Sequence, residues 1–443
     1  MLTEKLKYYL PTFVILFLLS GVYWGYANVW LCVVAFLVAL TRLNKEEFVF
    51  VMLMTGAEYF GAVVRIFTGF TIIPQFIVYM VVLVILLQRI AFLFNQNRMA
   101  NYLFFFLLVA IVMSYLYGPQ HAYSNTKLIR ILLYGMLCFW TFSIYNDKND
   151  INPQKLAHVF AIVGVTYIVM GVTVYHFGTP SSILDFGYFG RVVKMDEGFS
   201  LSYHSVGLAA LYGVVFLLSP KDDKSILAPR SIILLLLFIF IALISQMRQG
   251  ILGILVLLFV RYVVLIKSKM VKLFGILFLT GIVFFIFNDS QTDAFQAVAK
   301  ARSFEEAVNR SYNKALAIMD ESPFFGRGLG GYSDNGKIAY PHNIFLEIIN
   351  EMGFVGLLAI VVISLYAMWY NGFSLKLLNA NGTYAILLLL AIFIRVNASS
   401  DLMENIYFFS LLFSMSNKEY PIERNRIQQI SHTTINHKSN HIQ

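Results

Sequence analysis

The sequence predicts an all-α, polytopic transmembrane helix bundle of about 12 to 14 spans, with one long outer loop that contains an amphipathic helix. Three observations predict this class. Hydrophobic residues make up 59% of the 443 residues and charged residues only 13%, whereas an ordinary soluble domain carries about 25% charged residues. The mean hydropathy is +0.71, and apolar runs recur along the chain. Between two such runs lies one long stretch of mixed polarity, residues 289–342.

The apolar runs are long enough to cross a hydrocarbon core of about 30 Å. Lys5 and Lys7 precede the first run without a small-residue cleavage site after it, so we expect a retained span and not a removed signal peptide. We expect spans near residues 9–27, 28–41, 48–65, 71–94, 99–117, 128–145, 155–177, 199–219, 231–247, 249–266, 270–288, 343–370, 382–397 and 401–416.

The chain therefore divides into four parts. We expect an N-terminal transmembrane bundle at 1–288, a functional loop at 289–342, C-terminal transmembrane helices at 343–416, and a polar tail at 417–443. The composition of the tail is typical of disorder.

Lysine and arginine orient these spans. If the spans alternate as placed, one set of loops collects most of the positive charge, and the positive-inside rule makes that side cytoplasmic. Both termini then lie inside. The formal net charge of +9 is better explained by this topology than by binding to nucleic acid. The outer side receives residues 118–127, 178–200, 247–249 and 289–342.

The long outer loop contains its own helix. Ser303 and Glu306 have the spacing of a capping box, and apolar residues then recur at helical spacing up to Met319, before Pro323 ends the helix. Arg310 lies roughly 150° around the helix from this apolar stripe. Arg310 is either a functional cation or half of a surface Glu306–Arg310 pair, and the spacing alone leaves both open.

A glycine-rich segment follows, Gly326-Arg-Gly-Leu-Gly-Gly331. It matches the dinucleotide-binding pattern literally, but no strand precedes it and no lysine with serine or threonine completes a phosphate loop. We therefore expect tight turns and no nucleotide site.

His342 comes directly before the next apolar run. At a helix N-terminus the helix dipole lowers the pKa of an imidazole, which favours the neutral form that can accept a proton. The alternative is a purely structural histidine.

Arg248 sits between two apolar runs that have no real linker. An arginine at that depth needs a partner, so it is a functional candidate, with snorkelling to the lipid headgroups as the alternative. Arg191 lies near the mouth of the span that begins at about residue 200. We predict no metal site, and Cys32 and Cys138 fall inside apolar runs, where neither a disulfide framework nor zinc is expected.

Several arginines at one interface beside a histidine favour an anionic ligand carried by the membrane. Guanidinium groups bind phosphate oxygens through two parallel hydrogen bonds and stay charged at any depth. A lipid-linked pyrophosphate fits this pattern, and an incoming hydroxyl would displace it while His342 accepts the proton.

Four segments, in this order, resemble the O-antigen ligase and O-antigen polymerase family, bacterial membrane glycosyltransferases of the GT-C type. They are Gln246-Met-Arg-Gln-Gly250, the run that begins Arg310-Ser-Tyr-Asn, the segment Pro323-Phe-Phe-Gly-Arg-Gly-Leu-Gly330, and His342-Asn343 followed by Glu351-Met-Gly-Phe-Val-Gly356. Together they cover about 110 residues, and the first half of the chain resembles the family only in its hydropathy. Where the family often has serine before the first arginine, this chain has Met247.

The resemblance implies a metal-independent site on the periplasmic side of the bacterial inner membrane, with no cofactor. The donor would be an undecaprenyl-pyrophosphate-linked glycan, and the partners would include membrane lipid and a chain-length regulator protein. Arg248 and Arg310 would bind the pyrophosphate, and His342 would serve the acceptor hydroxyl. Substrate binding is assigned to Arg191, Arg327 and Asn343.

Ligase and polymerase share this constellation and differ in the acceptor. A ligase passes the chain to the lipid A core, and a polymerase passes it to a new lipid-linked repeat unit. The compact segment between Arg310 and His342 favours a polymerase. A transporter or flippase for lipid-linked sugar is the alternative from another class, but such proteins tend to show inverted repeats, and we find none in this sequence.

Overall fold

The computed structural model describes residues 27–68, 72–88, 98–147, 151–174, 203–219, 229–245, 247–265, 269–270, 273, 275–277, 304–333, 340–370, 383–397 and 402–414. Within these ranges the chain forms helices joined by turns and contains no strand, which confirms the predicted all-α class. The expected first span, the segment around Arg191 and the tail at 417–443 lie outside the described residues.

The helices follow the apolar runs closely. They are α2 (Ala27–Leu40), α3 (Lys45–Val51), the π-helix η2 (Met52–Gly56), α4 (Ala57–Thr68), α5 (Ile72–Leu87), α7 (Arg98–Tyr117), α8 (Ala122–Asp147), α9 (Pro153–Val174), α11 (Tyr203–Leu217), α12 (Pro229–Ser245), α13 (Arg248–Phe259), the π-helix η4 (Val260–Leu265), α16 (Phe304–Glu321), α17 (Ile344–Tyr370), α18 (Thr383–Val396) and α19 (Leu402–Ser414).

Among the described residues, four helical stretches are long and apolar enough to cross a membrane: Lys45–Val64, Met99–Tyr117, Pro153–Gly171 and Ile344–Trp369. Several shorter apolar helices accompany them. The protein is therefore an all-α membrane protein, while the expected number of spans stays a prediction.

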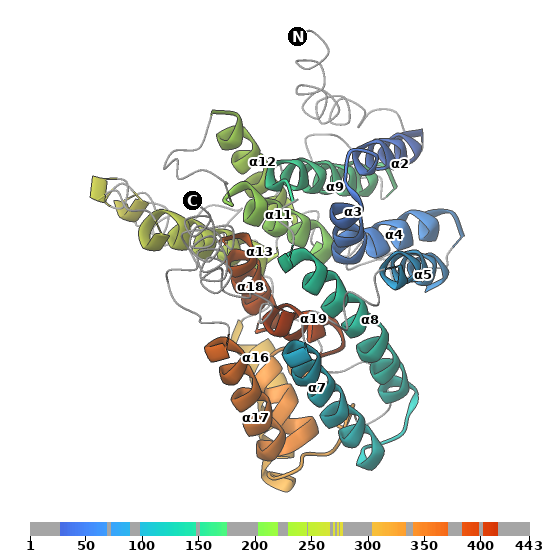
Figure 1. The fold of residues 1–443 in the computed structure, drawn as a ribbon, viewed down its shortest axis with the longest axis vertical. Coiled ribbons are helices and arrows are strands. Elements are labelled where there is room, and N and C mark those ends of the chain that lie inside the picture. The colour runs from blue at the N-terminus through green and yellow to red at the C-terminus, as the bar shows by residue number, and fades with distance from the viewer. Residues whose placement is uncertain are drawn as a thin grey trace, which may run out of the picture.

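Helices α9 and α11 form the centre of the bundle. They pack against each other, and α2 and α12 pack beside them. In the Pro153–Gly171 stretch of α9, 83% of the residues of its most apolar window are buried. Helices α18 and α19 connect this centre to a second group made of α7, α8, α16 and α17, which lies at the other end of the molecule (Figure 1).

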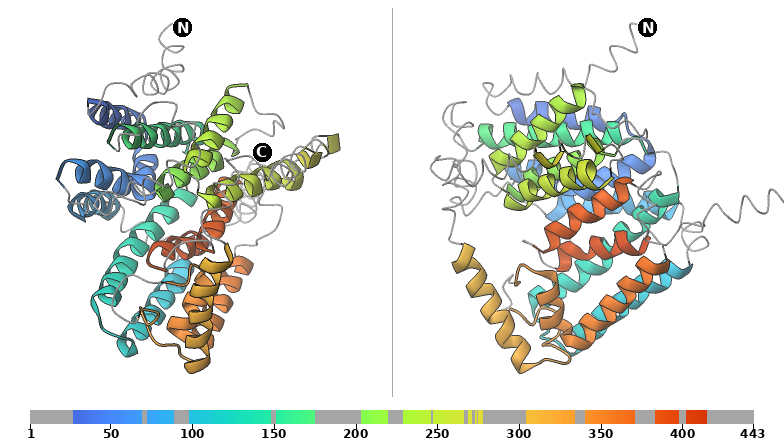
Figure 2. Two further views of the ribbon diagram at one scale, coloured as in Figure 1. Left: turned by 180° about the vertical axis from the view of Figure 1, so that it is seen from behind. Right: turned by 90° about the vertical axis from the view of Figure 1, so that its left-hand side faces the viewer.

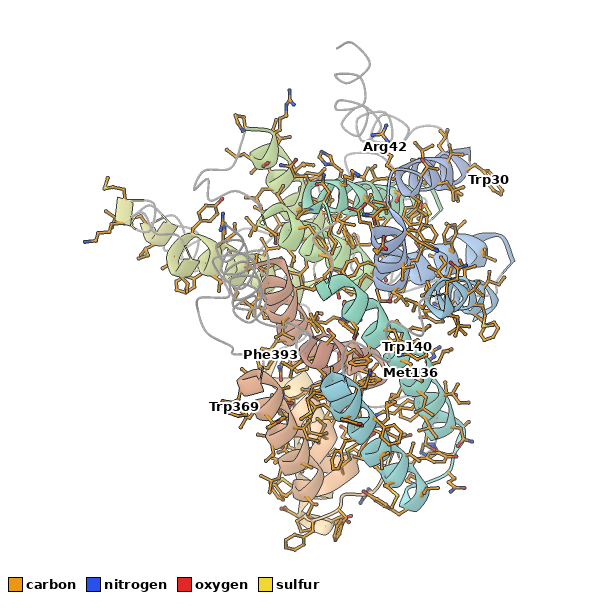
Figure 3. The ribbon with its side chains drawn as sticks, in the orientation of Figure 1. Trp30, Arg42, Met136, Trp140, Trp369 and Phe393 are labelled. Atoms are coloured by element: carbon orange, nitrogen blue, oxygen red, sulfur yellow. The ribbon has the colours of Figure 1, made fainter. Side chains whose placement is uncertain are left out.

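The outer surfaces of the peripheral helices are apolar. Trp30 on α2 and Trp369 on α17 are 60% and 75% exposed, and both point away from the bundle (Figure 3). On α7, Tyr102, Phe105 and Phe106 are exposed as well. Exposed apolar area of this extent is typical of a lipid-facing surface.

One expected span is not a single straight helix. The apolar run at 343–370 predicts one continuous helix, but α17 is broken at Gly353, where φ is 67° and ψ is −172°. The two parts of α17 run in different directions in the right-hand view of Figure 2. Only glycine adopts this backbone conformation without strain.

Candidate active site

The break in α17 is filled by the segment that follows α16. We call residues 323–331 the docking loop. The carbonyl oxygens of Asn350 and Glu351, which lose their helical partners at the break, accept hydrogen bonds from the backbone N–H groups of Arg327 and Gly328 at 2.7 and 3.0 Å. Beyond the break, the N–H groups of Phe354 and Val355 donate to the carbonyl oxygens of residues 323 and 324 at 2.8 and 3.2 Å.

These hydrogen bonds explain why a helix can be interrupted inside an apolar run. An unpaired backbone group in a membrane costs several kcal/mol, so non-helical backbone is tolerated where protein satisfies it. A Cβ at position 353 would lie 2.1 Å from the carbonyl oxygen of Phe324. The docking loop and Gly353 are therefore two halves of one structural unit.

The glycines of the docking loop allow close approach to α7. Gly328 has a φ of +82°, and a Cβ there would lie 2.1 Å from the Cα of Gly118. The N–H of Leu329 donates to the carbonyl oxygen of Ser114 at 3.1 Å, and the Tyr117 hydroxyl donates to the carbonyl oxygen of Phe325 at 2.6 Å. The expected tight turns are present, and they press the loop against the end of α7.

Beneath the docking loop lies a buried charge cluster of Lys127, Glu347 and Glu351. The Nζ of Lys127 on α8 lies 2.5 Å from Oε1 of Glu347 and 2.6 Å from Oε1 of Glu351. All three side chains are at most 1% exposed. Such a cluster needs further hydrogen bonds to offset its desolvation.

The backbone supplies those hydrogen bonds. The N–H of Gly330 donates to Oε1 of Glu351 at 2.9 Å, and the N–H of Leu402 donates to Oε1 of Glu347 at 2.8 Å. The buried charge cluster thus ties the starts of α8, α17 and α19 to the docking loop. The segments 118–127 and 289–342 were both expected on the outer side of the membrane, and here they meet.

The sequence carries a signal for these three residues, although their roles are not predicted from it. Two glutamates four residues apart in an apolar run, together with a lysine near another run, are rare in membrane helices and mark functional or paired positions. Their partners could not be read from the sequence, because Lys127 lies 220 and 224 positions away from them.

Helix α16 packs on the start of α17, with a face slightly rotated from the apolar stripe that the sequence predicts. Ala315 and Ile318 are buried against Tyr332, with Leu346 of α17 packed beside them. The predicted stripe ran through Ala315 to Met319, and Met319 is only partly buried. The predicted helix ends are confirmed: α16 begins at Phe304, directly after Ser303, and ends at Glu321 before Pro323.

Asn343 is the N-cap of α17. Its Oδ1 accepts hydrogen bonds from the N–H groups of Phe345 and Leu346 at 3.0 and 3.1 Å. This is the usual capping geometry. Asn343 therefore has a structural role here, and its expected part in substrate binding stays a prediction.

His342 projects just before this cap. Its side chain is exposed, its φ of 57° is in the left-handed region, and its ring meets the ring of Tyr340 edge-on, with centroids 4.6 Å apart. Desolvation by its surroundings lowers the pKa of the His342 imidazole below 6.5. This direction is the expected one, and partial desolvation of the ring, in place of the expected helix dipole, is its cause.

Arg248 begins α13, and the expected break before it is present. Met247 is the N-cap, with extended backbone and no side-chain cap, and it packs so closely on α11 that a Cβ at Gly207 would lie 2.5 Å from its sulfur. Gln249 is buried. The structure describes the backbone of Arg248 but not its side chain.

The other candidate arginines are placed as follows. Arg310 lies in the first half of α16, and its side chain is outside the description. Arg327 pairs with the carboxylate of Glu321, at a partly exposed position. Arg191 lies outside the described residues. The convergence of Arg248, Arg310 and His342 on one ligand thus stays a prediction, although α16 and the start of α17 are joined through Tyr332 and Leu346.

The comparison with known proteins agrees with this region of the chain. Residues 233–361 match the family model described as Wzy_C, O-antigen ligase, a range that runs from α12 to the second half of α17 and includes Arg248, Arg310, the docking loop and His342. No curated protein matches the chain. The match covers under a third of the chain and agrees with the resemblance found in the sequence.

Proposed function

We propose that this protein is an O-antigen polymerase of the bacterial inner membrane. It transfers a glycan from an undecaprenyl-pyrophosphate carrier to a lipid-linked repeat unit at the periplasmic face. The observation that carries the proposal is the docking loop seated in the break of α17, inside the region that matches the O-antigen ligase model. That seat fixes the loop after the helix of Arg310 to the helix that follows His342, which supports a common site.

The reaction is a displacement at the anomeric carbon of the donor. The acceptor hydroxyl forms the new C–O bond, and the bond to the pyrophosphate oxygen breaks, with the electron pair leaving on the pyrophosphate. The guanidinium groups of Arg248 and Arg310 stabilise the departing charge. His342 accepts the proton of the acceptor hydroxyl, because its lowered pKa keeps the imidazole neutral near pH 7.

The lipid tails of both substrates would lie against the apolar outer surfaces of the bundle. Exposed side chains such as Phe105 and Trp369 offer such a surface. A carrier lipid in the bilayer holds its pyrophosphate at the interface, where Arg248 and His342 are expected. Membrane lipid is therefore the required environment of the reaction, and no cofactor or nucleic acid takes part.

A ligase that passes the glycan to the lipid A core is the second candidate, and the matched family model carries that description. The segment between Arg310 and His342 is short, and the docking loop packs it tightly against α7 and α17. A compact segment favours the smaller lipid-linked acceptor, and hence a polymerase.

A flippase for lipid-linked sugar is supported by one observation, the interrupted helix α17, because transporters often break helices at their binding sites. In this chain the docking loop fills the interruption. Its backbone forms hydrogen bonds with N–H and C=O groups of α17 that a transported ligand or ion would bind in a transporter. The break therefore fits a positioning role better than a transport role.

The deciding experiment is the glycan profile of a bacterium that lacks this protein. We expect lipid A core carrying a single repeat unit, the result for a missing polymerase. Core alone, with lipid-linked polymer accumulating, would identify a ligase instead. Movement of lipid-linked sugar across vesicles without bond formation would support the flippase.

Complementation then tests the site. We expect Arg248→Lys, Arg310→Lys and His342→Ala to insert normally but to fail to extend chains, since lysine keeps the charge and loses the two-pronged hydrogen bonding. Arg42→Lys is the matched control, because Arg42 lies in the turn after α2 (Figure 3), outside the range that matches the family model. Full activity of both site lysine variants would overturn the pyrophosphate clamp.

A further inference from the structure

A small polar cavity lies among the helices, apart from the docking loop. Its volume is about 120 Å³, which is room for about four water molecules at the roughly 30 Å³ that each occupies in the liquid. Its wall is formed by η2, α4, α5, α8, α11 and α18, of which α4, α5 and α8 lie on one side of the molecule (Figure 1). Sites for organic ligands are several times larger. A ligand of this cavity is therefore no larger than a small ion with its nearest waters.

Two polar side chains of the wall have no partner in the protein. Within the part of the chain that the structure describes, the guanidinium of Arg130 and the amide of Gln75 form no hydrogen bond or ion pair. Arg130 lies inside the span expected at 128–145, about 12 Å along α8 from the first residue of that helix. An arginine at such a depth is costly and pairs with an opposite charge or with carbonyl groups. The unpaired Arg130 therefore indicates an anion as its partner.

The carboxylate of the wall does not supply that partner. Oε2 of Glu58 accepts a hydrogen bond from the Ser205 hydroxyl on α11 at 2.6 Å. Arg395 adds a second guanidinium to the wall, and it donates to the hydroxyl group of Tyr212 at 3.3 Å. The three charged side chains Glu58, Arg130 and Arg395 carry two positive charges and one negative charge. The potential in the cavity thus favours a negative ion.

One part of the wall has an irregular backbone. Leu53 and Met54 belong to the π-helix η2, which runs directly into α4 at Ala57. Such π-helical turns are rare and are frequent at functional sites. The carbonyl oxygen of Leu53 accepts a hydrogen bond from the Tyr134 hydroxyl on α8 at 3.4 Å. The π-helix is therefore tied to the helix that carries Arg130.

The charge and the size of the cavity select the ion. The cost of moving an ion from water into a medium of low dielectric constant rises with the square of its charge, so a singly charged ion enters a helix bundle at a lower cost than a doubly charged phosphate. Guanidinium and amide N–H groups and tyrosine hydroxyls all donate hydrogen bonds, which an anion accepts. A small singly charged anion fits both the volume and these donors, and chloride is the simplest such ion.

We propose that this cavity binds one chloride ion, with the guanidinium of Arg130 and the amide of Gln75 as its main donors. The ion would join α8 to α5 across the cavity and so stabilise the bundle. The site is separate from the candidate active site, and its test needs no transfer reaction. The proposal therefore stands or falls independently of the proposed function.

The first test compares two salts at constant ionic strength. The full-length protein in nanodiscs is unfolded by heat in sodium chloride and in sodium gluconate, whose six-carbon anion is too large for the cavity. A ligand that binds only the folded state raises the midpoint of unfolding as its concentration increases. We expect a higher midpoint in chloride, which rises as chloride replaces gluconate. Equal midpoints at every mixture of the two salts would overturn the proposal.

Two variants locate the ion. Arg130→Gln and Gln75→Leu each remove one donor, and each should raise the chloride concentration that gives half of the midpoint shift at least 10-fold. The matched control is Arg230→Gln, because Arg230 is exposed at the start of α12, and it should keep the chloride dependence of the wild type. If Arg130→Gln responds to chloride as the control does, the proposed site is wrong.

The same comparison guards against a general loss of stability. Arg130 is exposed and Gln75 is partly exposed, so both variants should fold. Each variant is compared with itself in the two salts, and a merely destabilised protein would still show the full chloride shift. Such a full shift in both variants would assign the effect to another part of the protein.

Other anions identify the ligand. Bromide should replace chloride in the stability test, and its anomalous scattering in crystals of the full-length protein should place it beside Arg130. Inorganic phosphate at the same ionic strength should give no shift. Stabilisation by phosphate but not by chloride would show that the choice of ion is wrong, and bromide bound only outside the cavity would contradict the site.

Discussion

Lys127 and Glu351 meet at 2.6 Å, from Nζ to Oε1, with 1% of each side chain exposed. The same lysine also pairs with Glu347. From the docking loop, the backbone N–H of Gly330 donates to the same oxygen, Oε1 of Glu351. One lysine therefore holds together the start of α8, the first part of α17 and the loop that fills the break of α17. The stability of the candidate active site should depend on this single cation.

Replacing Lys127 with methionine tests that dependence. The variant Lys127→Met leaves two buried carboxylates without their lysine, and removal of one partner from a buried ion pair destabilises a protein by about 3–5 kcal/mol. We expect a lower midpoint of thermal unfolding in detergent and loss of chain extension.

Two further variants interpret that result. The triple variant Lys127→Met, Glu347→Gln, Glu351→Gln removes the carboxylate charges and keeps acceptors for the N–H groups of Gly330 and Leu402, so it should regain more than half of the lost stability. Lys45→Met is the matched control, because Lys45 is exposed and bonds Gln88 at the surface. If Lys127→Met unfolds at the same midpoint as Lys45→Met, the buried charge cluster does not stabilise the protein.

Gly353 offers a second test of the docking loop. The variant Gly353→Ala places a methyl group 2.1 Å from the carbonyl oxygen of Phe324 and forces alanine into a left-handed backbone conformation, which itself costs about 1–3 kcal/mol. We expect the loop to detach from α17, with lower stability and little chain extension. Proteolysis of the loop in nanodiscs, compared with the wild type, would report the detachment.

The control for this variant is Gly164→Ala in α9, where the atoms nearest an added Cβ all belong to the Ile241 side chain, the terminal Cδ1 methyl at 2.9 Å first. Because that chain can move, the change should leave loop cleavage at the wild-type rate. Equal cleavage rates in the wild type and in Gly353→Ala would mean that the close contact at Phe324 does not hold the loop.

Much of the helical framework could be predicted from the sequence, because hydropathy and helix length act locally. The described helices α5, α7, α9, α12 and α18 begin within a few residues of the expected spans. Helix α8 begins earlier than expected, at Ala122, inside a segment read as an outer loop.

The interior of the candidate site could not be predicted in the same way. The break at Gly353 depends on hydrogen bonds from the docking loop, and a glycine inside an apolar run gives no sign of them. The burial of Ile318 in place of Met319 depends on where Tyr332 lies. Such contacts join distant segments, and only the folded chain brings them together.

The pH dependence of transfer should report on His342. A general base acts in its neutral form, and desolvation lowers the pKa of this imidazole below 6.5. Lowering the pH through that pKa protonates the base, so the rate should be constant near pH 7 and should fall only below pH 6.5. Initial rates of transfer between pH 5 and 8 would measure this fall, the acid limb of the pH–rate profile.

The variant His342→Ala assigns the acid limb. Loss of a general base lowers the rate by about 10²–10⁴-fold, and the remaining activity should lack the limb. Asn343 caps α17 through its own side chain, so the helix should stay intact in the variant. An unchanged limb at the same pH would assign the titration to another group.

The effect of chelators tests the role given to the arginines. If guanidinium groups stabilise the departing pyrophosphate, no divalent ion is required, and transfer should proceed at an unchanged rate in excess EDTA. The measurement is the initial rate of chain extension in nanodiscs with EDTA and with added magnesium. A strict requirement for a divalent ion would direct attention to the acidic residues Asp196, Glu197, Asp401 and Glu404. Their asparagine and glutamine variants would then show which carboxylates bind the ion, because loss of a ligand raises the concentration of magnesium needed for half-maximal rate.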